Sequence, residues 1–238
     1  MDDSRLYHAI PKWLEKITTN RNWERELQVL KSVLPTDQPI WEWGCKTGYL
    51  GQFLKYDHDW QGGESNPEYF RIGHNRHKAN IHPHEFPSSP VACIYAWFSP
   101  LFSVKPEELG HCLTQIFNSV KPSGWVVLEA GSNPAHARSR FSMMDIFEDK
   151  DEKLVRAAVP TLDDSVITFK YKWMVALKGA QKIEEVHETQ QYFLHPDESI
   201  TRIVQELGGE IRLIEVDGIR IWLMSKQVDV IERLMSSL

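Results

Sequence analysis

Cysteine is scarce in this chain, and long apolar runs and internal repeats are missing. The 238 residues include only three cysteines, Cys45, Cys93 and Cys112, and none of them sits in a CxxC pair. A set this small excludes a disulfide framework and favours a reducing compartment, so we expect a cytoplasmic protein. No apolar run approaches the ~18 residues that a membrane span needs. The acidic and soon polar start of the chain is unlike a secretory signal.

An excess of positive charge is also missing. The chain has 27 Lys and Arg against 33 Asp and Glu, which gives a formal net charge of -6. Surfaces that coat nucleic acid or anionic lipid carry the opposite balance, so we expect neither a nucleic-acid partner nor a membrane partner. Hydrophobic residues make up 42% and charged residues 25% of the chain, as in a folded protein with a sizeable core.

Residues 39–130 alternate between short strand-like segments and segments of helical periodicity. The segments that read as strands are 39–43, 59–63, 91–97 and 125–130. The helix after the second run has Asn66 as its N-cap and Pro67 in its first position, and a turn is expected at 121–124. This alternation predicts βαβ units and a mostly parallel sheet.

The pattern changes after residue 145. An acidic loop is expected at 145–153, and three antiparallel strands are expected at 154–162, 165–178 and 181–194. A helix at 196–207 and a hairpin around Asp217-Gly218 follow. We therefore predict a single domain, with the parts 1–35 (helical cap), 36–145 and 196–226 (α/β core), 150–195 (antiparallel insert or lid) and 227–238 (C-terminal helix). The exposed edges of the insert predict a homodimer.

The stretch Glu42-Trp43-Gly44-Cys45-Lys46-Thr47-Gly48 leaves a predicted strand and enters a predicted helix. A glycine-rich turn there lets backbone N–H groups approach a ligand closely. Glu64 follows the next strand, about 20 residues on, where a carboxylate binds the ribose hydroxyls in nucleotide-binding α/β folds. Turn and carboxylate together indicate an adenosine-type ligand. A P-loop is excluded because Cys45 precedes Lys46, and a dinucleotide fingerprint because Lys46 and Tyr49 occupy glycine positions.

At these residues the chain resembles the class I S-adenosylmethionine (SAM)-dependent methyltransferases. Glu42, Gly44 and Gly48 match the family's first motif, acidic-x-Gly-x-Gly-x-Gly. Residues 62–68 (GGESNPE) resemble the second motif, residues 121–129 (KPSGWVVLE) are similar to the turn and fifth strand, and residues 193–200 (FLHPDESI) resemble the start of a late helix. The resemblance implies a Rossmann-like fold with a seven-stranded, mostly parallel sheet. It also implies SAM as cofactor and methyl transfer to oxygen or nitrogen of a small-molecule acceptor, as in methyltransferases for amino-sugar nucleotides.

The resemblance and the strand ends together assign site residues. Cofactor contacts are expected from Glu42, Gly44, Lys46, Gly48, Glu64, Ser65, Glu85 and Trp97. Glu85 is the candidate for the adenine amino group, and Trp97 offers cation–π stabilisation to the sulfonium. Acceptor contacts are expected from Tyr7, Phe98 and Ser99.

Methyl transfer from SAM needs in-line placement of the acceptor and no covalent nucleophile. A base is needed where the acceptor loses a proton. His187, in the insert, and His136, after the fifth strand, are the candidates, because histidine exchanges protons near neutral pH. The alternative for His187 is a surface histidine on an alternating strand. His74, His77, His82 and His84 match no common zinc spacing, so no metal is expected.

Lys46 leaves the function open between alternatives. It stands where the family has its middle glycine, and it either pairs with the SAM carboxylate or blocks the pocket. A blocked pocket would make the chain a methyltransferase-like binding or assembly protein with lost or altered use of SAM. An enzyme that uses SAM without donating its methyl group is the third alternative.

Overall fold

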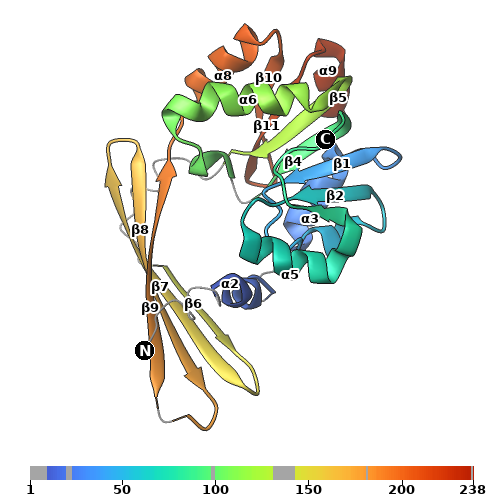
Figure 1. Cartoon of the computed structure of the whole chain (residues 1–238). Coiled ribbons are helices and arrows are strands. Elements are labelled where there is room, and N and C mark those ends of the chain that lie inside the picture. Colours follow the sequence, from blue (N-terminus) through green and yellow to red (C-terminus); the bar gives the residue numbers. More distant parts are fainter. Residues whose placement is uncertain (1–9, 20–22, 98–99, 131–142, 181, 237) are drawn as a thin grey trace. The chain divides into compact units, whose positions relative to one another are not determined.

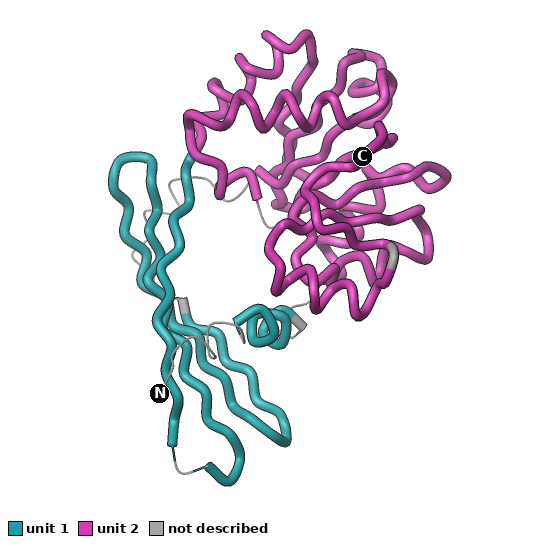
Figure 2. Tube along the Cα trace, in the orientation of Figure 1, with its two compact units in different colours: residues 1–22, 132–194 teal, residues 23–131, 195–238 magenta. Residues whose placement is uncertain are grey.

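The computed structural model describes residues 10–19, 23–97, 100–130, 143–180, 182–236 and 238. The chain divides into two compact units, which Figure 2 colours separately. We name residues 1–22 and 132–194 the insert unit, and residues 23–131 and 195–238 the core unit. The boundary between residues 22 and 23 lies between the first two helices, Ile10–Thr19 and Glu24–Val33.

A seven-stranded sheet forms the centre of the core unit, in the order β10-β11-β5-β4-β1-β2-β3 (Figure 1). The strands are β1 (Pro39–Trp43), β2 (Asp59–Gly63), β3 (Ile81–His82), β4 (Val91–Ala96), β5 (Val120–Glu129), β10 (Glu210–Val216) and β11 (Ile219–Ser225). The first five pair in parallel, whereas β11 is antiparallel to both β5 and β10. This topology confirms the expected mostly parallel, Rossmann-like sheet.

Helices cover both faces of this sheet. They are α3 (Glu24–Val33), α4 (Gly51–Leu54), α5 (Pro67–His77), α6 (Leu109–Asn118), α8 (Asp197–Glu206) and α9 (Val228–Ser236), with short 3-10 turns η1 (Lys78–Asn80), η2 (Pro100–Ser103) and η3 (Pro106–Glu108). Residues of α3, α4 and α9 share one buried apolar cluster with Ile40 of β1. Residues of α6 and α8 share the other with Trp41. Burial on both faces explains why the central strands are continuous apolar runs.

Local signals account for several element boundaries. The side chain of Asn66 accepts hydrogen bonds from the backbone N–H groups of Glu68 (3.0 Å) and Tyr69 (3.3 Å), which begins α5 as expected. Asp217 and Gly218 both have positive φ, as a two-residue hairpin requires. The prediction that a turn at 121–124 precedes the fifth strand is wrong, because β5 already begins at Val120. Residues 121–124 instead form an irregularity within β5, where its register to β4 shifts between Val91 and Cys93.

The insert unit consists of α2 (Ile10–Thr19) and a four-stranded antiparallel sheet in the order β6-β7-β8-β9. The strands are β6 (Met143–Glu148), β7 (Glu152–Asp163), β8 (Val166–Leu177) and β9 (Ile183–Phe193). The loop expected at 145–153 is therefore wrong except at residues 149–151, which connect β6 to β7. Asp145 accepts a hydrogen bond from Nε of Arg156 (2.8 Å) across the β6–β7 ladder, so this acidic residue is a paired strand residue.

One face of the insert sheet packs under α2. Trp13 of α2 lies 6.0 Å from Trp173 of β8, measured between ring centroids, and both are buried.

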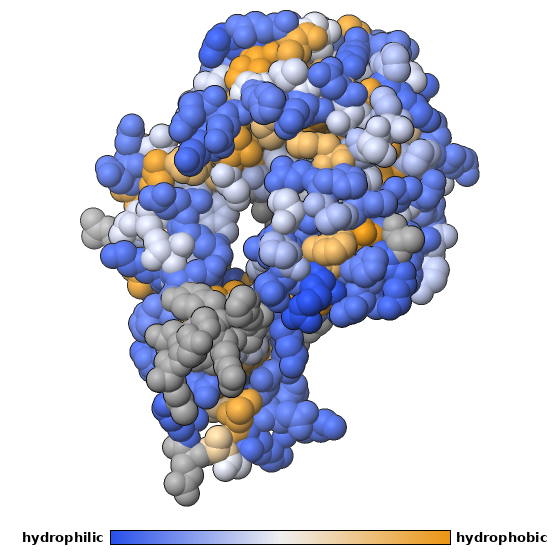
Figure 3. Space-filling model, viewed as in Figure 1, coloured by the Kyte–Doolittle hydropathy of each residue, from blue (hydrophilic) through white to orange (hydrophobic). Residues whose placement is uncertain are grey.

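Large apolar side chains also stay exposed in the insert unit, namely Met144, Ile146, Val159, Leu177 and Ile183. The face of the molecule drawn in Figure 3 is mainly hydrophilic, with hydrophobic residues in small groups. A homodimer through the insert stays a prediction, which light scattering would test.

No helix in the described ranges is long and apolar enough to cross a membrane.

Gly63 lies at the end of β2, where backbone from the segment after β3 approaches closely. A Cβ atom there would lie 2.4 Å from the carbonyl oxygen of His84 and 2.5 Å from that of Glu85. We expect Gly63→Ala to lower the free energy of unfolding by about 1–3 kcal/mol, as overpacking does. Gly110 is the matched control, because a Cβ there meets nothing within 4 Å. Gly110→Ala should be stabilising by about 0.5–1 kcal/mol in the same urea titration, and equal effects of the two variants would contradict the steric argument.

Candidate cofactor site

The loop after β1 has a strained, repeated backbone conformation. Gly44, Lys46 and Gly48 have φ values of 67°, 52° and 68°, all in the left-handed region. A Cβ atom on Gly48 would lie 2.7 Å from side-chain atoms of both His77 and Ile81, so this position requires glycine. Lys46 adopts the same conformation although it carries a side chain, which indicates that its backbone is held by other contacts.

Glu64 supplies those contacts. Its side chain follows the end of β2 and is 7% exposed. Oε2 accepts a hydrogen bond from the backbone N–H of Lys46 (2.8 Å), and Oε1 accepts one from the backbone N–H of Asn66 (2.7 Å). Burial raises the pKa of this carboxyl, while the two backbone hydrogen bonds and the charge of Lys46 act against the rise. Each oxygen keeps a further lone pair, so the carboxylate can still accept hydrogen bonds from a ligand.

Glu42 lies two residues before Gly44 and is 2% exposed. Its Oε2 accepts hydrogen bonds from the hydroxyl of Tyr95 (2.8 Å) and from Nε1 of Trp60 (3.0 Å). Desolvation raises the pKa of Glu42 to about 7, although Tyr95, Trp60 and the charge of Lys46 lower it. Trp60 and Tyr95 were not expected at the site, because their sequence surroundings indicate only that each lies within a strand.

Ser65 and Glu85 come together beside the end of β2. The Ser65 hydroxyl donates to Oε1 of Glu85 (2.9 Å), and Nε1 of Trp43 lies 3.4 Å from Oε2 of the same carboxylate. Nε1 of Trp41 donates to the Glu85 carbonyl oxygen (2.8 Å), which holds the segment after β3 against β1. Two residues that the resemblance assigned to the cofactor are therefore neighbours in space.

Comparison with known proteins gives structural neighbours only. No protein-family model and no curated protein matches the sequence. SAM-bound CalS10, an amino pentose methyltransferase from Micromonospora echinaspora involved in calicheamicin biosynthesis, is 15% identical, with a TM-score of 0.74 over 87% of this chain and 92% of that chain. The sugar N-methyltransferase KedS8 from Streptoalloteichus sp ATCC 53650 is 14% identical, with a TM-score of 0.75 over 87% and 89% of the two chains. DesVI from Streptomyces venezuelae is 18% identical, with a TM-score of 0.74 over 85% and 89%.

This chain has the fold of the class I SAM-dependent methyltransferases. The resemblance of the motifs is thereby confirmed at the level of the fold. In this methyltransferase fold, the loop between Gly44 and Gly48 and the carboxylate of Glu64 lie at the carboxyl ends of β1 and β2. That end of an open parallel sheet is where such folds bind their ligands.

Trp97 directly follows β4 and is 2% exposed. It belongs to the buried apolar cluster that also contains Leu50 and Tyr95, so its ring packs in the core. Its contact with a sulfonium stays a prediction. Tyr7, Phe98, Ser99 and His136 lie outside the described residues.

His187 lies on β9 in the insert unit and is exposed. Its neighbours in the strand, Val186 and Glu188, point to the other face, where Val186 joins the buried cluster under α2. His187 therefore shares the outer face with the ion pair between Lys172 and Glu185 (2.9 Å). Its role as a base stays a prediction.

A hydrogen-bonded array that sequence reasoning missed lies on the face of the insert sheet opposite to His187. The Tyr192 hydroxyl donates to Oε1 of Gln190 (2.8 Å), and Nε2 of Gln190 donates to Oε1 of Glu188 (2.6 Å). Nε1 of Trp173 donates to Oε2 of Glu188 (3.2 Å). The alternation along β9 predicts that Glu188, Gln190 and Tyr192 share a face. It does not predict which of the two faces, theirs or that of His187, carries a hydrogen-bonded array.

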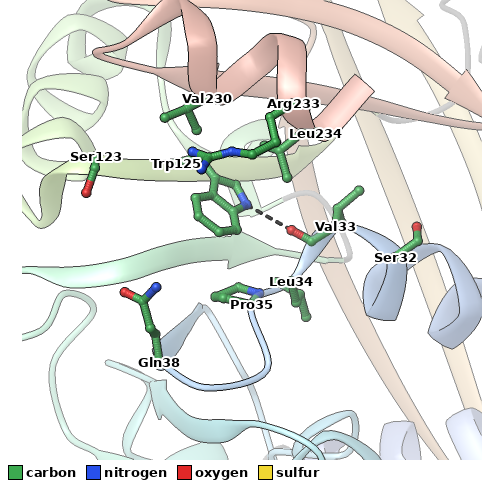
Figure 4. Close-up of a pocket in the computed structure, with 10 residues that line it drawn as sticks. All are labelled: Ser32, Val33, Leu34, Pro35, Gln38, Ser123, Trp125, Val230, Arg233 and Leu234. Atoms are coloured by element: carbon green, nitrogen blue, oxygen red, sulfur yellow. Dashed lines mark hydrogen bonds between the residues drawn. The ribbon is translucent and has the colours of Figure 1, made fainter. Parts of the chain in front are cut away.

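A pocket of about 360 Å³ lies at the opposite end of the core sheet (Figure 4). Its lining comes from the segments before β1, within β5 and along α9, and consists of Ser32, Val33, Leu34, Pro35, Gln38, Ser123, Trp125, Val230, Arg233 and Leu234. Nε1 of Trp125 donates to the carbonyl oxygen of Val33 (2.8 Å) across it. Because it adjoins the amino ends of β1 and β5, this pocket is separate from the candidate cofactor site.

The histidines of the discarded zinc hypothesis have packing partners. The rings of His82 and His84 stack on Trp41, with centroid distances of 5.1 and 5.8 Å, and the ring of His77 lies 5.1 Å from Trp60. Within the described part of the chain, no group of three or more His, Cys, Asp or Glu residues is arranged to hold a metal ion.

Proposed function

We propose that this chain is a SAM-dependent methyltransferase that acts on an oxygen or nitrogen atom of a small molecule. The observation that carries the proposal is the contact between the loop and the second strand. The backbone N–H of Lys46 donates to Glu64 (2.8 Å), so a strained glycine-rich turn is held against a buried carboxylate. In a methyltransferase fold, this arrangement fits a nucleoside with a charged amino-acid part.

The residues of the site fit SAM by their chemistry. Glu64 has lone pairs left for the two ribose hydroxyls, and Glu85 would accept a hydrogen bond from the adenine amino group. Glycine at positions 44 and 48 allows the left-handed turn and leaves backbone N–H groups uncovered for a ligand. Lys46 supplies a cation for the ligand's carboxylate. SAM, when bound, supplies a methyl group on a sulfonium.

An amino sugar is the acceptor class that we propose. CalS10 is described as an amino pentose methyltransferase and KedS8 as a sugar N-methyltransferase, and the chain has their fold. An amine must present its lone pair to the methyl group, so an ammonium acceptor has to lose a proton first. His187 and His136 remain our candidates for the base, and Tyr7, Phe98 and Ser99 for contacts to the acceptor.

A cytoplasmic location is also proposed. All three cysteines are free and buried, which fits a compartment where thiols stay reduced.

Isothermal titration of the purified chain with SAM and with S-adenosylhomocysteine, its demethylated product, tests the cofactor. We expect binding of both, and methylation of at least one member of a panel of amino sugars attached to nucleoside diphosphates. Absence of binding by both compounds would overturn the proposal. Binding of both compounds without methylation of any acceptor would support the cofactor site but contradict the proposed acceptor class.

Lys46 provides the test between the enzyme and the binding-protein alternative. If its ammonium group pairs with the cofactor's carboxylate, Lys46→Gly should weaken SAM binding roughly 10-fold or more, the loss expected for a hydrogen bond to a charged group. Lys46→Arg, which keeps the charge, should bind within a few-fold of the wild type. If Lys46→Gly instead creates affinity that the wild type lacks, the lysine blocks the pocket and the chain is a methyltransferase-like binding protein.

A further inference from the structure

Three buried polar side chains from three adjacent strands form a closed triangle beneath the glycine-rich loop. Glu42 comes from β1, Trp60 from β2 and Tyr95 from β4, and they are 2%, 1% and 0% exposed. The Tyr95 hydroxyl and Nε1 of Trp60 both donate to Oε2 of Glu42, at 2.8 and 3.0 Å. The same indole N–H lies 2.9 Å from the Tyr95 hydroxyl. Burial of three polar groups in an apolar cluster is costly unless every group is satisfied.

The two donors converge on one oxygen of the carboxylate. Among the described residues, Oε1 of Glu42 accepts no hydrogen bond from the protein. Glu42 is separated by one residue from Gly44, where the chain turns into the loop. An ionised carboxylate with one oxygen held and the other available is a receptor for a cationic donor.

We propose that Trp60 and Tyr95 are positioning residues, which orient Glu42 so that its second oxygen binds the ammonium group of the cofactor's amino-acid part. The inference rests on the proposed function, since SAM and S-adenosylhomocysteine both carry this ammonium group. It adds two residues to the site that act through a third, and it makes cofactor affinity depend on the protonation of Glu42.

The sign of this dependence follows from the surroundings of Glu42. Desolvation raises its pKa to about 7, and the hydrogen bonds from Tyr95 and Trp60 and the charge of Lys46 lower it, whereas the charge of Glu64 raises it. Cys45 has a pKa raised by burial, so it stays a neutral thiol beside these carboxylates. Glu42 therefore gains and loses its proton near neutral pH. Loss of either donor should raise the pKa further.

The test is the pH profile of S-adenosylhomocysteine affinity between pH 5.5 and 9, measured by calorimetry. For the wild type we expect affinity to rise with pH to a plateau, with a midpoint near the pKa of about 7. Tyr95→Phe should move this midpoint upward by roughly one pH unit, the effect of one hydrogen bond to a charged group. Its binding at pH 7 should be several-fold weaker and should recover at pH 9. Glu42→Gln should bind weakly, with no midpoint in this range.

Ser225→Ala is the matched control, because it also removes a buried hydroxyl from a strand of the same sheet. The Ser225 hydroxyl donates to the carbonyl oxygen of Gly124 (2.9 Å), at the amino end of β5. A merely structural loss, as in this variant, should leave the midpoint where the wild type has it.

A second measurement, made without cofactor, follows the free energy of unfolding against pH. For the wild type this free energy should fall between pH 4.5 and about 7, because the folded state holds the Glu42 proton more tightly than the unfolded state. Glu42→Gln should lack this fall, and in Tyr95→Phe it should extend to higher pH.

The outcomes separate the two proposals. A wild-type affinity that does not change with pH, or a Tyr95→Phe midpoint equal to that of the wild type, overturns the positioning role and leaves the proposed function intact. Absence of binding at every pH overturns the proposed function and the cofactor part of this inference with it. Unfolding curves that are identical in Tyr95→Phe and the wild type overturn the claim that Tyr95 stabilises the ionised Glu42.

Discussion

Replacement of Glu64 by alanine is expected to weaken SAM binding by at least ~100-fold, because several hydrogen bonds to a charged group are lost together. The carboxylate is the proposed partner of the ribose hydroxyls. It also accepts hydrogen bonds from the backbone N–H groups of Lys46 (2.8 Å) and Asn66 (2.7 Å). Alanine therefore removes a ligand contact and also releases the strained turn at Lys46. Titration with S-adenosylhomocysteine measures the loss.

Glu64→Gln is the control for this experiment. The amide keeps one oxygen acceptor and the size of the side chain, but it has no charge and presents an NH2 group to one of the two backbone donors. We expect an intermediate loss, larger than for Lys46→Arg and smaller than for Glu64→Ala. If Glu64→Ala binds as tightly as the wild type, the carboxylate only caps the segment before α5 and the ribose assignment is wrong.

Trp41→Ala is expected to lower the free energy of unfolding by about 3–5 kcal/mol, as other truncations of large buried aromatic residues do. Trp41 is 2% exposed in the central strand β1, and its ring stacks on His82 and His84. Its Nε1 also donates to the carbonyl oxygen of Glu85 (2.8 Å). The truncation leaves a cavity and frees the segment after β3. Urea unfolding followed by far-ultraviolet circular dichroism measures the change.

Trp41→Phe separates the two contributions. Phenylalanine keeps most of the buried ring but cannot donate to Glu85, so we expect a smaller loss of about 1–3 kcal/mol. A loss below 1 kcal/mol in Trp41→Ala would mean that the histidines and the strand repack around the missing ring. Because Glu85 is a proposed adenine contact, Trp41→Phe should also weaken cofactor binding at unchanged pH.

Local sequence was sufficient for the elements that carry the loop. The Asn66-Pro67 start of α5, the hairpin at Asp217-Gly218 and the strand before Gly44 all follow from capping, turn and burial preferences that act over a few residues. The fourth strand of the insert was missed because Asp145 and Glu148 make β6 look polar. Its pairing with β7 places Asp145 opposite Arg156, and that partner is not visible in the local pattern.

The sequence by itself determined the alternating α/β core, the glycine-rich turn at positions 44–48, and the place of Glu64 at the end of the next strand. Each of these depends on backbone preferences and on spacing along the chain. Only the tertiary structure decided that Trp60 and Tyr95 converge on Glu42, because that contact requires β1 to lie between β2 and β4. Strand order arises from long-range packing of the helices on the two faces of the sheet, and a residue's own neighbours in sequence carry no record of it.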